Sequence, residues 1–179
     1  MLLGVIMIAS ASVMAETVSF SYGTNFFSPS QNGFATSNGR TTVLEWTLDS
    51  GITFGVVNEQ TTLDFTNPAN AAQTDRGLFA LNGIRLMQKV IDRVQVGIGL
   101  GYASVTPTGA GTTADTASVV DILGEIKLFS GEGKKVEGAL VATVAARYMN
   151  TPNLTLSAGV CPINDMNGTN MGLAVKIGF

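Results

Sequence analysis

The chain contains no histidine and only one cysteine, Cys161, among its 179 residues. Without histidine, the Ser-His-Asp and Cys-His catalytic arrangements and the common zinc sites are unavailable. A lone cysteine cannot form an intramolecular disulfide, and no cationic neighbour indicates a reactive Cys161 thiol. We therefore expect no catalytic residues, no metal site and no cofactor.

Charged residues are also scarce, at 13% of the chain, which is about half the roughly 25% found in an ordinary soluble domain. Ten Lys and Arg residues against thirteen Asp and Glu residues give a net charge of -3. Such a chain has no basic field to hold a nucleic-acid backbone, so we expect no nucleic-acid partner. A mean hydropathy of +0.31 excludes an intrinsically disordered chain, and the length favours one domain.

Long apolar runs are missing beyond the start of the chain: no 18 consecutive apolar residues follow residue 16, so we expect no transmembrane helix. An apolar run at 2–9, too short to span a bilayer, is followed by small residues and Val13-Met14-Ala15. This is typical of a secretory signal peptide, although the positively charged n-region is missing. We predict a signal peptide at 1–15, cleaved after Ala15, and one domain at 16–179. The alternative is a buried N-terminal strand of a cytoplasmic protein.

What the chain does have is alternation of apolar with polar or tiny residues, the pattern of a strand with two unlike faces. The clearest examples lie at 94–102, 136–148 and 171–179, and weaker ones at 18–22, 44–48, 52–56, 78–86 and 118–128. Twenty-one glycines, about 12% against a usual 7%, favour turns and tightly packed strands over helices. The sequence therefore predicts an all-β fold with eight strands.

The connections between these strands alternate in length. Short connections are expected at 49–51, 88–92 and 130–134, and long ones at 25–40, 66–76, 103–115 and 149–169. Long and short connections at opposite ends predict an antiparallel up-and-down β-barrel. A further alternating run at 154–160 would make nine strands, whereas bacterial single-chain barrels have even numbers. We interpret that run as part of the last long loop, as a hairpin rising above the barrel.

The positions between the apolar residues hold four acids and four bases. They are Glu45, Arg85, Asp121, Glu125, Lys127, Glu137, Arg147 and Lys176. This balance suits a narrow interior in which buried charges are paired, and the lumen of eight strands is only wide enough for side chains to fill. We therefore predict a transmembrane barrel with these charges inside and its apolar face toward lipid. In a soluble barrel, the alternative, the same charges would face bulk water.

Aromatic residues on the apolar face are expected near both ends of the barrel. Tyr22, Tyr102 and Tyr148 are predicted at the outer ends of their strands, and Trp46, Phe54 and Phe179 at the inner ends. Membrane barrels carry aromatic belts at both interfaces, so we predict that these six side chains lie at the membrane surfaces. Asn82 breaks the apolar pattern.

With these features the chain resembles the small eight-stranded outer-membrane β-barrel proteins of Gram-negative bacteria. The most specific part is the last strand, in which Val175, Ile177 and Phe179 alternate up to the terminal residue. This ending resembles the signal that those proteins present to the barrel-assembly machinery. The resemblance implies localisation in the bacterial outer membrane, contact with outer-membrane lipid, and escort by periplasmic chaperones and the assembly machinery.

For function, the sequence favours a structural or surface-interaction role, with the long connections available to a surface ligand that remains unknown. One alternative is a narrow conduit for small solutes or apolar molecules. Another is a soluble periplasmic, lipocalin-like ligand-binding barrel. For an enzyme, the only carboxylates worth naming are Asp121 and Glu125, which would lie roughly 13 Å apart along one strand, beyond the separations of glycosidase pairs. We predict that the protein is not an enzyme.

Overall fold

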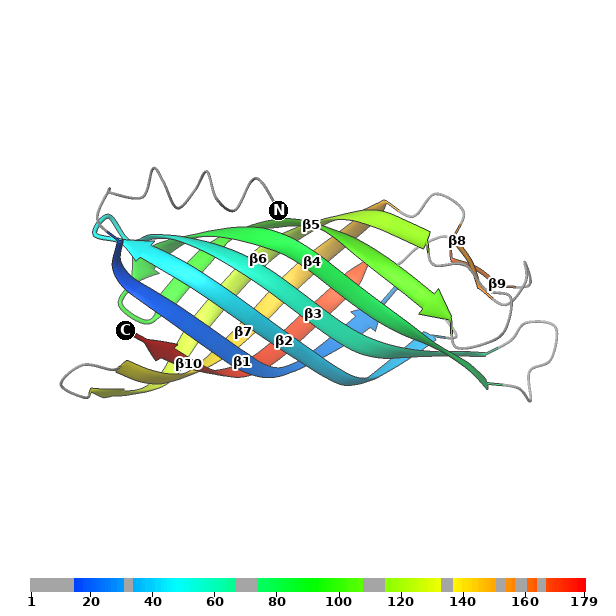
Figure 1. Ribbon diagram of the computed structural model, residues 1–179, viewed down its shortest axis with the longest axis horizontal. Helices are drawn as coiled ribbons and strands as arrows, with labels where there is room; N and C mark the ends of the chain where they lie inside the picture. The colour runs from blue at the N-terminus through cyan, green and yellow to red at the C-terminus, as the bar shows by residue number, and fades with distance from the viewer. Residues whose placement is uncertain are drawn as a thin grey trace.

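The computed structural model describes residues 15–30, 34–66, 74–107, 115–132, 137–150, 154–156, 161–163 and 167–179. The predicted signal segment at 1–15 lies outside these residues except for Ala15, which begins the first strand. Eight long strands form the body of the molecule (Figure 1). They are β1 (Ala15–Pro29), β2 (Phe34–Leu48), β3 (Ile52–Thr66), β4 (Thr74–Ile91), β5 (Val94–Pro107), β6 (Asp115–Glu132), β7 (Glu137–Asn150) and β10 (Gly168–Gly178).

These strands form one closed barrel in the order β1-β10-β7-β6-β5-β4-β3-β2, and every neighbouring pair is antiparallel. The predicted all-β, eight-stranded, up-and-down barrel is confirmed, and the described residues include no helix. The barrel closes where β1 meets β10. There the Phe179 N–H donates to the Val18 carbonyl at 2.8 Å and the Val18 N–H donates back at 3.3 Å.

Two short strands stand apart from the barrel. β8 (Leu154–Leu156) pairs antiparallel with β9 (Cys161–Ile163) in a separate two-stranded sheet. In Figure 1 they lie at the end of the molecule opposite the C-terminus. The prediction that the 154–160 run is not a ninth barrel strand is confirmed for residues 154–156, which pair outside the barrel, and residues 157–160 lie outside the described part of the chain.

The strands are longer than the sequence pattern predicted. β1 and β2 together occupy most of 25–40, which was expected to be a long loop, and β3 continues ten residues beyond Val56. The prediction failed because polar residues occupy both faces near the long-connection end. Thr24, Asn58 and Gln60 are exposed there, next to the inward Asn25, Glu59 and Thr61. The short turn at 49–51 is confirmed, and its left-handed residue is Gly51, with φ of 78°.

The pairing register gives the barrel its stagger. One row of partners runs from Leu140 through Val175 and Tyr22, and then around the remaining strands to Asn150. It returns to β7 ten residues from where it began. For eight strands this corresponds to a tilt of about 43°, so one residue advances about 2.4 Å along the axis and one strand step about 3 Å.

Candidate functional site

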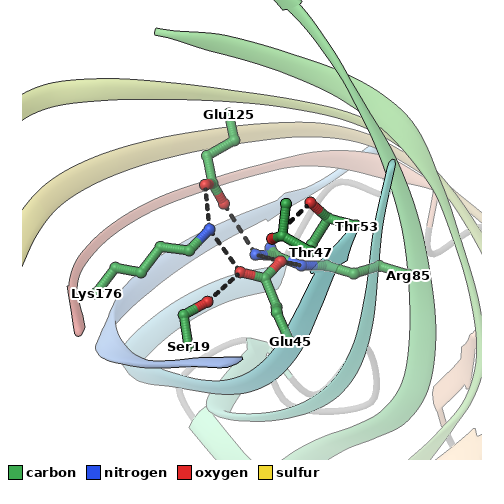
Figure 2. A network of polar contacts seen from close by, with 7 residues as sticks. All are labelled: Ser19, Glu45, Thr47, Thr53, Arg85, Glu125 and Lys176. Carbon is green, nitrogen blue, oxygen red and sulfur yellow. Dashed lines mark hydrogen bonds and ion pairs between the residues drawn. The ribbon is translucent and has the colours of Figure 1, made fainter. Parts of the chain in front are cut away.

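The interior of the barrel contains a closed ring of alternating charges near the short-turn end. This ring cluster consists of Glu45, Arg85, Glu125 and Lys176, from β2, β4, β6 and β10, which are alternate strands of the barrel (Figure 2). Arg85 donates from Nε to Glu45 Oε1 at 2.7 Å and from Nη2 to Glu125 Oε2 at 2.9 Å. Lys176 Nζ lies 2.5 Å from Glu45 Oε2 and 2.9 Å from Glu125 Oε1. Two acids and two bases are thus mutually neutralised, with Glu45, Arg85 and Glu125 buried and Lys176 largely buried.

A second cluster lies further toward the long-connection end and consists of Glu59, Asp121 and Arg147. The guanidinium of Arg147 donates to both oxygens of Glu59, at 3.1 and 2.8 Å, and to both oxygens of Asp121, at 2.9 and 2.7 Å. Asn170 donates to Glu59 at 2.8 Å, and Asn25 donates to the same oxygen. This Arg147 cluster holds two carboxylates against one cation, and the two carboxamides stabilise the extra negative charge.

Beyond the Arg147 cluster the interior becomes apolar. Nine residues with exposures of 7% or less form an apolar layer. They are Phe27, Leu63, Phe79, Leu81, Ala103, Val105, Ala117, Val119 and Met149. The rings of Phe27 and Phe79 stack with centroids 5.5 Å apart, and the Arg147 guanidinium carbon lies 5.2 and 5.7 Å from these centroids. Cation–π contacts therefore join the charged part of the interior to the apolar part.

A small cavity of about 50 Å³ separates the two charged clusters. Arg85 from the ring cluster and Glu59, Asp121 and Arg147 from the second cluster line it. A polar cavity of this volume has room for a few water molecules. Apart from this cavity, the two clusters and the apolar layer fill the described interior with side chains.

Of the eight predicted interior charges, the structure brings six into the two clusters. Asp121 and Glu125, considered together in the sequence as a carboxylate pair, lie in different clusters. Lys127 is half-buried on the inward parity of β6 and forms no ion pair with the described residues. The side chain of Glu137 lies outside the described part of the chain.

Sequence reasoning missed Glu59 and the whole apolar layer. Glu59 has the same parity as Thr53 and Gly55, so extending the strand beyond Val56 would have placed it inside. The apolar layer was missed because the interior was expected to be charged throughout. Alternation of polar with apolar residues identifies a strand with unlike faces, and it gives no signal where both faces are apolar.

The six predicted aromatic residues all lie on the outward face. Tyr102 and Tyr148 lie toward the long-connection end, and Trp46, Phe54 and Phe179 toward the other end. The prediction that Tyr22 lies near the outer end of its strand is wrong. β1 is fifteen residues long with Tyr22 at its middle.

The amide of Asn82, which breaks the apolar pattern, is paired on the outer face. Its Oδ1 accepts a hydrogen bond of 2.8 Å from Nδ2 of Asn58 on the neighbouring strand. This pairing satisfies one polar group of each side chain and lowers the cost of placing carboxamides among apolar neighbours.

Comparisons with known proteins do not assign the chain to a family. No protein-family model matches the chain, and no curated protein matches it significantly. Within the described ranges, no helix is long and apolar enough to cross a membrane. The same residues contain no group of three or more acidic or cysteine side chains suited to a metal ion.

Proposed function

We propose that this protein is an integral outer-membrane β-barrel with a closed interior and a structural or surface-interaction role, similar to the small eight-stranded barrels of Gram-negative bacteria. The observation that carries the proposal is the inversion of its two faces. Among the residues that the structure describes, twenty-seven large apolar side chains are exposed, while Glu45, Arg85 and Arg147 are buried inside. Soluble proteins rarely expose a continuous apolar surface of this extent, whereas lipid solvates such a surface.

The height of the apolar band supports a membrane environment. Phe129 lies near its lower edge and Tyr148, whose pairing partner is Val120, near its upper edge. On β7 eight residues separate Tyr148 from Leu140, the partner of Phe129, and with one strand step this corresponds to roughly 22 Å along the axis. This is close to the apolar band of about 25 Å in known membrane barrels.

The filled interior favours a structural role over conduction. A solute on the axis would have to break the ion pairs of both charged clusters and displace the stacked rings of Phe27 and Phe79. Removing one partner from a buried ion pair costs several kcal/mol, about 3–5. In planar bilayers we expect recordings at baseline after insertion has been verified. Discrete conductance steps would favour the conduit instead.

Heat-modifiability tests the membrane assignment. The full chain is expressed in a Gram-negative host, and outer-membrane and soluble periplasmic fractions are compared on SDS gels with and without boiling. We expect recovery in the outer-membrane fraction and a mobility shift on boiling. Recovery in the soluble periplasm without a shift would overturn the proposal and favour the lipocalin-like alternative.

The predicted assembly signal has a matched control within the chain. Phe179 and Phe129 are both exposed aromatic residues, at 67% and 72%, near the same end of the barrel. We expect Phe179→Ala to lower the heat-modifiable fraction in the outer membrane severalfold and Phe129→Ala to leave it nearly unchanged. Equal effects would show that Phe179 contributes only apolar surface.

A further inference from the structure

A hollow of about 580 Å³ lies on the outer face of the barrel, across the neighbouring strands β2, β1, β10 and β7. Its outward side chains fall into two groups. The polar group is Asn38, Arg40 and Thr24, and the apolar group includes Tyr22, Leu173 and Val175. The hollow is therefore amphipathic, in a surface that is otherwise mostly apolar.

The two groups lie one above the other along the barrel axis. Thr42, Tyr22, Val175 and Leu140 form one pairing row, which descends toward the short-turn end by about 3 Å per strand. Arg40 lies two residues above Thr42 on β2. Arg40 is therefore roughly 14 Å above Leu140, which also lines the hollow. The hollow thus has a cationic upper end and an apolar lower end, in the direction that a lipid molecule takes in a membrane.

The guanidinium of Arg40 is available for a ligand. Its residue is exposed, and it forms no ion pair or hydrogen bond with the described part of the chain. Asn38 approaches the same end of the hollow because a bulge between Ser37 and Arg40 interrupts the pairing of β2 with β3, with Asn38 at φ of 53°. A cation, a carboxamide and the Thr24 hydroxyl together suit a phosphate group.

We propose that this hollow binds a lipid with an anionic phosphate headgroup. The headgroup pairs with Arg40 and accepts hydrogen bonds from Asn38 and Thr24. One acyl chain runs along Tyr22, Leu173 and Val175. This inference rests on the proposed membrane location and adds the chemical class of a bound lipid to it.

Trp46 provides a built-in probe, because it is the only tryptophan in the chain. It lies on the outward face of β2, six residues below Arg40 and about level with Leu140 at the apolar end of the hollow, where the acyl chains would end. The barrel is refolded into phosphatidylcholine vesicles that contain a minor fraction of phosphatidic acid, and either lipid carries brominated acyl chains. Quenching of Trp46 fluorescence then gives the relative affinity of the two lipids. We expect a preference for phosphatidic acid of about fivefold, the typical contribution of one arginine to binding at an anionic surface.

Two substitutions and a control locate this preference. Arg40→Gln removes the cation, and Thr24→Phe fills the hollow without changing charge. Arg93→Gln removes an exposed arginine from the β4–β5 turn at the other end of the barrel. We expect the preference for phosphatidic acid to disappear in R40Q, with an affinity ratio of about one. It should decrease in T24F and stay near fivefold in R93Q.

Three results would overturn the inference. Equal quenching by both lipids, without a headgroup preference, would overturn the lipid inference but not the proposed function. Equal losses of the phosphatidic acid preference in R40Q and R93Q would have the same meaning. If neither brominated lipid quenches the fluorescence of Trp46, the barrel is not inserted in the membrane. That result would overturn the proposed function as well.

Discussion

The two halves of the barrel interior exclude water by different physical means. Toward the short-turn end, four strands contribute the ring cluster of Glu45, Arg85, Glu125 and Lys176. Toward the long-connection end, the apolar layer around Phe27 and Phe79 fills the same cross-section. Dispersion and the hydrophobic effect are non-directional, whereas hydrogen-bonded ion pairs require one geometry. The apolar half therefore fills volume, and the charged half also selects the arrangement of the strands.

Register shows why this difference matters. A slip of one residue in a strand that carries inward charges would turn those charges toward the outer, apolar face. Ion pairs between strands that are not neighbours, such as Arg147 on β7 with Glu59 on β3, make the correct closure more favourable than a slipped one. The apolar layer offers less discrimination, because apolar side chains are tolerated on both faces there.

Of the substitutions that test this comparison, removal of Arg147 is expected to change the free energy of unfolding most. Arg147→Ala leaves the carboxylates of Glu59 and Asp121 buried without a cation, and we expect a loss of about 4 kcal/mol in the free energy of unfolding. Urea unfolding of the barrel refolded in lipid vesicles measures this loss. The triple variant R147M/E59Q/D121N should recover most of it, because no uncompensated charge remains. An equally unstable triple variant would contradict this account.

In the apolar layer a second substitution should lower the free energy of unfolding further, whereas in the Arg147 cluster further substitutions should restore it. Phe79 is fully buried, and Phe79→Ala should cost about 3 kcal/mol through lost transfer free energy and a residual cavity. Adding Phe27→Ala should lower stability further, because the cavity grows. The same unfolding measurement checks both variants. Recovery of stability in the F79A/F27A variant would mean that the apolar layer and the charged half respond alike to further substitution.

Packing around the ring cluster should give a smaller effect. A β-carbon at Gly55 would lie 3.0 Å from Cγ of Arg85 and 3.1 Å from Cγ of Glu45. Gly55→Ala should therefore displace this ion pair and cost about 1–2 kcal/mol. Gly138→Ala is the matched control, because a β-carbon there meets nothing within 4 Å. Similar losses in the two variants would assign the effect to the strand backbone and not to the ring cluster.

The exposed ion pair at the β4–β5 turn should have the smallest effect. Lys89 Nζ lies 2.9 Å from Asp92 Oδ1, and the hydrogen bond and charge of Lys89 lower the pKa of Asp92. A lowered carboxyl pKa stabilises the fold above the unfolded-state pKa, and this contribution disappears as pH falls through the folded-state pKa. Because solvent screens the pair, Lys89→Ala should leave unfolding at neutral pH unchanged. NMR titration should show the Asp92 pKa rising toward its ordinary value.

The sequence was most informative where alternation was clean. The strands around 94–102 and 171–179 were predicted with their inward and outward parity, since every second residue there is apolar. The same parity placed Arg85, Glu125 and Lys176 in the interior. It did not extend to Glu59, because the alternation weakens after Val56 and the strand was ended too early. It also gave no sign that Phe27 and Phe79 share an apolar layer.

The sequence by itself determined the all-β fold, the number of barrel strands and the two faces of each clearly alternating strand, because a period of two is a local property of extended chain. Only the tertiary structure decided which charges pair and where the interior changes from charged to apolar. Those depend on the stagger of ten residues around the barrel, which sets the height of every residue on the axis. A stagger emerges only when the last strand pairs with the first, so no single segment of the sequence encodes it.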